Sequence, residues 1–146
     1  DNPMRVEDIL REEGTNVATT SPDANISSAL AMLSDRGIGA LVVSTATNPV
    51  SGILSERDIV SAFAAQGSSV LSESGDTSMT SPVVSCAPEE LRTDAMATMT
   101  TKRFRHMPVV EAGKLIGIVS IGDLVKHRLY ELEQETSSLR AYIATA

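Results

Sequence analysis

Gly52-Ile53-Leu54-Ser55-Glu56-Arg57-Asp58 and Gly117-Ile118-Val119-Ser120-Ile121-Gly122-Asp123 carry one pattern, Gly-Ile-apolar-Ser-x-x-Asp, within a chain of 146 residues. The first glycines of the two copies stand 65 positions apart. In both copies an apolar run that favours a strand ends at the serine, and a helical pattern begins there. The duplicated motif predicts a chain built from two copies of one structural unit.

The rest of the chain repeats in the same way. An offset of 66 residues places Val17 and Pro22 on Val83 and Pro88, and the offset falls to 65 at the second motif because one turn is a residue shorter. We therefore expect a first unit at residues 4–66, a Ser- and Gly-rich linker at 67–78, a second unit at 79–128 and a tail at 129–146.

Each unit has the order β-α-β-β-α, so the expected fold class is α/β (α+β). In the first unit we expect a helix that starts at Ser21-Pro22-Asp23 and ends at Gly37, strands at 17–20, 41–43 and 50–54, and a second helix from Ser55 that carries Ile59, Val60 and Phe63. The second unit repeats this order, with strands at 83–84, 107–110 and 115–119, and helices at 91–100 and from Ser120.

The tail continues the last helix. Apolar residues recur at alternating spacings of four and three, interrupted only at Thr136, which predicts one long helix with a single apolar line: Val125, Leu129, Leu132, Leu139 and Ile143. Such a line packs either against a partner chain or back on its own domain, and the sequence leaves both open. His127, on the same helix, is expected at the surface or at an interface.

The composition excludes several classes of function. Hydrophobic residues make up 42% and aromatic residues 3% of the chain, which indicates a globular protein with an aliphatic core. A net charge of -7 and scarce aromatic residues argue against a nucleic-acid partner, which needs many Lys and Arg contacts to phosphates. No Cys-x-x-Cys or His-x-x-x-His spacing indicates a metal site.

The cysteine content and hydropathy bear on location. Cys86 is the single cysteine, so no intrachain disulfide can form, which suits a reducing compartment. The chain has no run of about 18 apolar residues, and its first residues do not resemble a signal peptide. We expect a cytoplasmic protein without a membrane partner.

The Ser-x-x-Asp element has two interpretations. Serine followed three residues later by an acid is typical of a helix N-terminal capping box. The usual acid there is Glu or Gln, whereas both copies carry Asp, and each copy has a glycine that admits a close neighbour. The same atoms suit a nucleotide, because helix N-terminal amides attract phosphate and an aspartate accepts both hydrogens of a ribose diol. A cap and a ligand site are compatible.

The double unit, its two closing motifs and the strand Arg105-His106-Met107-Pro108-Val109-Val110 together resemble a tandem pair of cystathionine-β-synthase (CBS) domains, over residues 4–127. The resemblance implies two repeats packed as a pseudo-twofold pair, with two clefts that bind adenosyl ligands. AMP is expected first, with ATP, ADP, NAD(H) or S-adenosylmethionine as further candidates. It also implies a homodimer.

The resemblance also implies the site residues. The first cleft would hold Ser120, Gly122 and Asp123 with Ser21, Gly39 and Ala40, and with Arg105 and His106 nearby. The second would hold Ser55, Arg57, Asp58 and Ala87. The clefts differ, since Ala87 lacks the hydroxyl of Ser21 while Arg57 stands where the other motif has Gly122.

The function expected from this resemblance is a non-catalytic, regulatory and energy-sensing module that acts on a protein the sequence does not identify. No nucleophile with a neighbouring base is visible, so we do not expect an enzyme. Two alternatives stay open at this point: a structural dimerisation module with degenerate clefts, and a regulatory fragment associated with enzymes such as inosine-5'-monophosphate dehydrogenase.

Overall fold

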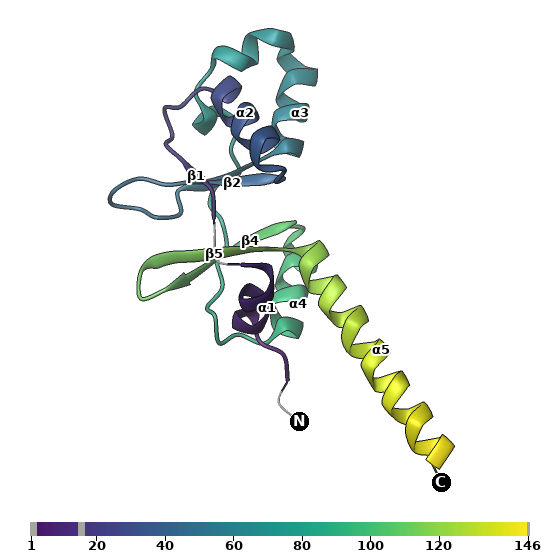
Figure 1. Ribbon diagram of the computed structural model, residues 1–146. Helices are drawn as coiled ribbons and strands as arrows, with labels where there is room; N and C mark the ends of the chain where they lie inside the picture. The colour runs from purple at the N-terminus through teal and green to yellow at the C-terminus, as the bar shows by residue number, and fades with distance from the viewer. Residues whose placement is uncertain (1–2, 15–16, 146) are drawn as a thin grey trace.

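The structure is a computed structural model that describes residues 3–14 and 17–145. It has two lobes, each a small sheet covered by helices on its outer face, and the two sheets face each other in the middle (Figure 1). The elements in chain order are α1 (Val6–Glu13), β1 (Thr19–Thr20), α2 (Ile26–Arg36), β2 (Ala40–Val43), β3 (Gly52–Ser55), α3 (Glu56–Gln66), α4 (Arg92–Lys102), β4 (His106–Glu111), β5 (Lys114–Ser120) and α5 (Ile121–Thr145). The expected mixed fold of two repeats followed by a long C-terminal helix is confirmed, and the order β-α-β-β-α is complete in the first repeat.

The first lobe follows the predicted order closely. β1 runs parallel to β2, and β2 pairs antiparallel with β3, so that Ala40 lies opposite Ser55. The predicted start of the first helix is wrong: α2 begins four residues after Pro22, because the side chain of Asn25 accepts a hydrogen bond from the Ser28 N–H (2.8 Å) and caps the helix there. Gly37 ends α2 in the left-handed conformation, as predicted.

The second lobe lacks the strand predicted at 83–84. Its sheet contains β4 and β5, and only Cys86 bridges to Val109 from the preceding segment. The backbone N–H of Cys86 donates to the Pro108 carbonyl (2.9 Å), and the Cys86 carbonyl accepts from the Val110 N–H (2.9 Å). In the first lobe the equivalent ladder continues through the Val42 N–H, but Pro108 stands at that position and has no N–H to donate. The strand therefore shrinks to one bridge.

α3 and the segment after it bury different amounts of apolar surface. On α3 only Ile59 is buried, whereas Val60 and Phe63 are exposed. Residues 67–78, expected to be a linker, form two short 3₁₀ helices, η1 (Gly67–Ser72) and η2 (Gly75–Thr77), and Val70 is fully buried in the core of the first lobe. The stretch is therefore part of a packed core.

The sequence did not predict α1, and α1 packs against the second lobe. Val6, Ile9 and Leu10 join its core, which also contains Met99 and Leu124. The backbone of Arg5 bridges to Leu91 at the start of α4, and Ser74 bridges in the same way to Asn25 at the start of α2. Each lobe is thus completed by the segment that precedes the other repeat, and this exchange links the two lobes.

The motif glycines lie where these exchanged segments dock. A Cβ on Gly117 would come within 2.7 Å of Leu10 Cδ2, and one on Gly52 within 2.6 Å of Met79 Sδ and 2.9 Å of the Thr80 carbonyl oxygen. Thr80 also exchanges two backbone hydrogen bonds with Ile53. The sequence predicted that these glycines allow another group to approach closely, and that group is a segment of the same chain.

The tail forms one long helix with the end of the second repeat, as predicted. α5 packs on its own lobe through its first turns and then extends away from the lobe (Figure 1). The expectation for His127 is wrong: it is 3% exposed, because α1 covers it, and its Nε2 lies 3.2 Å from Glu13 Oε1. The alternative that the tail folds back on its own domain is also wrong, since Leu139 and Ile143 are exposed.

Substitution of Gly52 by Ala should destabilise the fold by about 1–3 kcal/mol, because the added methyl group meets a backbone carbonyl held in two hydrogen bonds. Gly117→Ala should cost less, since the end of the Leu10 side chain can move. Urea unfolding measures both. Gly122→Ala is the control, because its Cβ would make only an ordinary contact with Ser120 Oγ (3.6 Å) and alanine favours a helix, so a loss of stability there equal to that of Gly52→Ala would contradict the close contact at Gly52.

Candidate functional site

Both Ser-x-x-Asp elements form reciprocal capping boxes. The Asp58 N–H donates to Ser55 Oγ (3.1 Å), and the Ser55 N–H donates to Asp58 Oδ2 (2.9 Å). The second copy repeats this geometry, with 3.0 Å from the Asp123 N–H to Ser120 Oγ and 3.1 Å back to Asp123 Oδ2. Aspartate therefore serves as the third-position acid, and the capping interpretation holds in both repeats. The caps also fix the two carboxylates at the mouths of two clefts.

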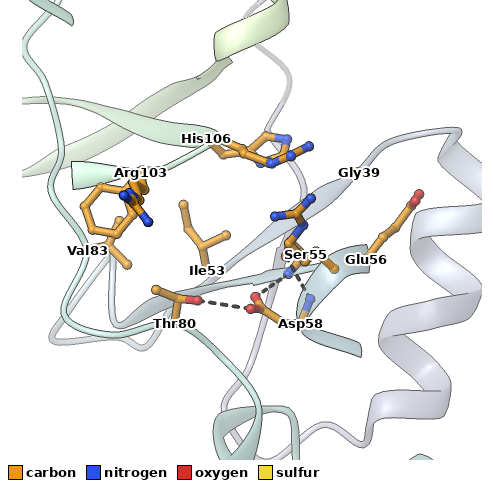
Figure 2. A pocket seen from close by; sticks show the side chains of 12 residues that line it. Gly39, Ile53, Ser55, Glu56, Asp58, Thr80, Val83, Arg103 and His106 are labelled. Atoms are coloured by element: carbon orange, nitrogen blue, oxygen red, sulfur yellow. Dashed lines mark hydrogen bonds between the residues drawn. The ribbon is translucent and has the colours of Figure 1, made fainter. Parts of the chain in front are cut away.

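The first of these clefts, here the Asp58 cleft, has a volume of about 370 Å³ and lies between the two lobes. The closing motif of the first repeat forms one wall, and the segment between α4 and β4 forms the opposite wall (Figure 2). Ile53 lies between these walls in the view of Figure 2. Thr80, from the exchanged segment, donates from its hydroxyl to Asp58 Oδ1 (3.1 Å). The lining residues are Gly39, Ile53, Ser55, Glu56, Arg57, Asp58, Thr80, Val83, Arg103, Phe104, Arg105 and His106.

Arg103 holds an unusual backbone conformation in this lining. It follows the last residue of α4 with φ 60° and ψ 34°, a left-handed geometry that costs a residue with a side chain about 1 kcal/mol or more. The equivalent position of the first repeat is Gly37, with φ 62° and ψ 40°. A glycine is thus the ordinary residue at this helix end, and the second repeat places an arginine there instead.

The Asp58 cleft is the cationic one. Three arginines are among its lining residues, Arg57, Arg103 and Arg105, together with two acidic residues, Glu56 and Asp58. The chain as a whole carries a net charge of -7, so this group of positively charged residues is opposite in sign to the net charge of the protein. Together with the N-terminus of α3, it forms a site suited to a phosphate group.

The second cleft, here the Asp123 cleft, has a volume of about 340 Å³ and no Lys or Arg in its lining. Its wall opposite Ser120 and Asp123 is the segment that ends α2 and begins β2. The lining residues are Ala18, Gly37, Ile38, Gly39, Ala40, His106, Ile118, Ser120 and Asp123. An uncharged wall replaces the arginine wall of the Asp58 cleft.

His106 and Gly39 line both clefts. Burial lowers the pKa of His106 below its usual value, Arg105 adds to this effect, and the carboxylates of Asp123, Asp58 and Glu56 oppose it. The imidazole is therefore mainly neutral at pH 7 and able to accept as well as donate a hydrogen bond.

The structure brings most of the expected site residues together. Gly39, Ala40, His106, Ser120 and Asp123 line the Asp123 cleft, and Ser55, Arg57 and Asp58 line the other. Arg105, expected beside the first group, lines the Asp58 cleft instead.

Three of the expected residues, Ser21, Ala87 and Gly122, lie outside the lining of both clefts. Ser21 accepts a backbone hydrogen bond from Ala24 in a turn ahead of α2, and Ala87 forms the equivalent turn with Glu90.

Thr80, Val83 and Arg103 line the Asp58 cleft but were not expected there from the sequence. The signal for Arg103 was its alignment with Gly37, which placed an arginine where a helix end favours glycine. Thr80 and Val83 had no such signal, because only the exchange of segments between lobes brings them to the motif of the first repeat.

Other reactive groups in the described part of the chain are few. Cys86 is buried, and burial with a contribution from Glu90 raises the pKa of its thiol to about 12, so it is protonated at neutral pH. Residues 3–14 and 17–145 contain no group of three or more His, Cys, Asp and Glu side chains placed to hold a metal ion. No helix in these ranges is long and apolar enough to cross a membrane.

A sequence profile of the CBS domain matches the chain twice, over residues 6–65 and 75–130. The chain belongs to the CBS domain family. It carries two CBS repeats, and the mitochondrial CBS domain-containing protein CBSX3 of Arabidopsis thaliana is 31% identical to it over 94% of this chain and 71% of the relative. The CBS domain-containing protein YhcV of Bacillus subtilis is 31% identical over 79% of this chain and 81% of the relative.

Solved structures of CBS-domain proteins agree with this assignment. The chain is similar to a CBS-domain-containing protein from Agrobacterium tumefaciens, with a TM-score of 0.81 and 45% identity over 86% of this chain and 99% of the other. A putative signal-transduction protein with CBS domains from Burkholderia ambifaria gives a TM-score of 0.80 and 34% identity over 87% and 95%. The CBS pair here is thus similar to small proteins of nearly the same extent.

The stability of this CBS pair should fall when the pH drops below about 6.5. Because the pKa of His106 is lowered in the folded state, the unfolded chain takes up a proton first, and the free energy of unfolding decreases until the pH reaches the folded-state pKa. Urea unfolding at about pH 7.5 and about pH 5 measures this loss. The loss should be smaller in His106→Gln, and an equal loss in both proteins would contradict the assignment to His106.

Proposed function

We propose that this CBS pair is a regulatory module that binds an adenine nucleotide in the Asp58 cleft. The observation that carries the proposal is the convergence of three arginines, a helix N-terminus and a motif aspartate in one cleft between the lobes. AMP is the first candidate, and ADP, ATP, NAD(H) and S-adenosylmethionine are further members of the same adenosyl class. We also propose a cytoplasmic location, which suits a chain whose single cysteine cannot form an intrachain disulfide.

The phosphate would lie near the first turn of α3. There the Glu56 N–H donates to the Gly39 carbonyl (2.9 Å) and the Asp58 N–H donates to Ser55, so within the described residues the Arg57 N–H is the first-turn donor left to a ligand. Helix N-terminal amides and guanidinium groups both favour an anion. Arg57 and Arg103 line the cleft from opposite lobes, which supports a phosphate that bridges them.

The ribose and the base would occupy the rest of the cleft. Asp58 already accepts one hydrogen bond on each oxygen, and an ionised carboxylate has about four acceptor positions, so it can also accept from a ribose diol. Ile53, Val83 and Phe104 supply apolar surface for a flat base.

A structural neighbour supports the adenosyl class. The CBS domain pair of protein MJ0100, with a TM-score of 0.76 and 22% identity, was crystallised with 5'-methylthioadenosine and S-adenosyl-L-methionine. At that identity the likeness concerns the fold, which can therefore accept adenosyl groups. The arginines of the Asp58 cleft favour a phosphorylated member of the class for this chain.

Regulation would follow from where the ligand lies. Asp58 belongs to the first repeat and Arg103 to the second, so a bound nucleotide contacts both lobes and stabilises one relative arrangement of them. A partner protein would detect that arrangement of the two lobes, and no chemical step on the nucleotide is required. The regulatory role thus needs only that the nucleotide binds one arrangement more tightly than another.

Calorimetry with AMP tests the binding proposal. We expect a dissociation constant in about the micromolar range for the unchanged protein, and a loss of roughly tenfold or more in Asp58→Ala. Asp123→Ala is the matched control, because it removes an equivalent cap at a stability cost of about 1 kcal/mol and leaves the Asp58 cleft intact. Equal effects of the two substitutions would place the site elsewhere, and no binding of any adenosyl ligand would favour the structural dimerisation module.

Arg103→Gly separates the phosphate role from stability. Glycine relieves the left-handed backbone, so the free energy of unfolding should rise by about 0.5–1 kcal/mol, while affinity for AMP falls by about tenfold and affinity for adenosine stays unchanged. Urea unfolding and calorimetry measure the two effects. Lys102→Ala removes a neighbouring cation outside the cleft lining and should alter neither ligand. An equal loss for AMP and adenosine would refute the phosphate contact.

A further inference from the structure

α5 exposes an apolar seam along its length, interrupted by one threonine. The seam, here called the α5 seam, consists of Val125, Leu129, Leu132, Thr136, Leu139 and Ile143. Leu129, Leu139 and Ile143 are 58%, 59% and 66% exposed, in a helix that has left its own lobe over its last turns. The alternating spacing of four and three is the repeat of a coiled coil, with Val125, Leu132 and Leu139 at d positions and the other three at a positions.

The seam is separate from the face that α5 buries against its own lobe. Leu124 and His127 form that buried face. At about 100° per residue, the α5 seam lies about 130° around the helix from it. A second helix can therefore pack on the seam while α5 stays docked on its own lobe.

We infer that the partner on this seam is a second copy of the same chain, paired in parallel and in register as a two-stranded coiled coil. Four of the six core positions support two strands, since Thr136 and Ile143 at a are β-branched and Leu132 and Leu139 at d are leucines, while Leu129 at a and Val125 at d have the reverse pattern. This inference goes beyond nucleotide binding and does not rest on it.

The charges beside the seam favour the parallel orientation. In a parallel pair, each g residue lies next to the e residue five positions later in the partner. Arg128 (g) then meets Glu133 (e), and Glu135 (g) meets Arg140 (e), so twofold symmetry gives four attractive pairs. Within residues 3–14 and 17–145, no ion pair engages any of these four side chains.

The antiparallel orientation brings like charges together. When a positions face d positions of the reversed partner, Leu129 opposes Leu139 and the helices cross near Gln134. Glu133 then lies beside its own copy, and so does Glu135. These repulsions occur at every such contact near the centre, so the sequence beside the seam specifies one orientation.

The parallel pairing fixes the shape of the dimer. The twofold axis runs along the two α5 helices, and both CBS pairs lie at the same end of the coiled coil, beside the N-terminal turns of α5. The seam covers under three heptads, so we expect the coiled coil to set the orientation of the two domains in a dimer of modest strength.

Disulfide trapping tests the register directly. In the parallel pair Thr136 faces its own copy across the axis, so Thr136→Cys should give a covalent dimer under mild oxidation, read on a non-reducing gel. Ser138→Cys, two residues on and outside the seam, is the matched control and should remain monomeric on that gel. The unchanged protein sets the background, because Cys86 is buried. A Thr136→Cys yield no greater than that of Ser138→Cys would overturn the proposal.

Charge exchange tests the pairing between chains. By sedimentation equilibrium, Glu133→Arg should weaken dimerisation by about tenfold, because it meets Arg128 of the partner copy twice. Adding Arg128→Glu should restore it, whereas an antiparallel pair would keep two arginines apposed at position 133 and show no rescue.

Leu139→Glu should weaken the dimer more than Ser138→Glu, and an unchanged mass in Leu139→Glu would also overturn the proposal. All these positions are exposed or half-exposed, so circular dichroism should show an unchanged fold.

Discussion

The exchange of segments between the two repeats is the constraint on which the rest of this structure depends. The start of α2 is bridged by Ser74, ahead of the second repeat, and the start of α4 is bridged by Arg5, ahead of the first. Neither lobe has a complete core without the other's leading segment, as Leu10 on Gly117 shows. The same exchange places Thr80 beside Asp58, so the contact that completes the fold also completes a wall of the Asp58 cleft.

Much of the fold could be predicted because several local sequence signals occur in both repeats. The closing motifs, the end of α2 at Gly37 and the continuous α5 follow from local chemistry: serine at a helix start, glycine at a helix end, and apolar spacing along a helix. The prediction for 83–84 failed through a single missing N–H at Pro108 in a partner strand. Such an effect cannot be seen in the segment that loses its partner.

Part of the lining of both clefts could also be predicted from the sequence. The carboxylates and the entry to each middle strand were expected in the clefts, and they line them. Ser21 and Ala87 were expected there too, but they form turns outside the lining, because the chain needs several residues between the proline and the start of the helix. Residues that reach a site through exchange of segments, such as Thr80 and Val83, lie beyond any argument from spacing.

The segments that follow α2 and α4 begin with the same backbone geometry but carry different side chains. Gly37-Ile38-Gly39-Ala40 and Arg103-Phe104-Arg105-His106 occupy equivalent positions, and the left-handed geometry is the same at the first residue of each. The small residues leave the lining of the Asp123 cleft without a Lys or Arg, while the large ones bring arginines to the Asp58 cleft. Duplication thus gave one protein two sites of different chemistry on one scaffold.

Gly39 and His106 give these two sites a common wall. A Cβ on Gly39 would lie 3.7 Å from His106 Nε2, so the partition between the clefts is a bare backbone and one imidazole ring. A ligand that turns this ring or changes its protonation in one cleft changes the donor or acceptor presented to the other. If both clefts held ligands, this shared ring would couple their occupancy, and such coupling would be reciprocal: whatever one ligand did to the affinity of the second, the second would do to the first by the same factor.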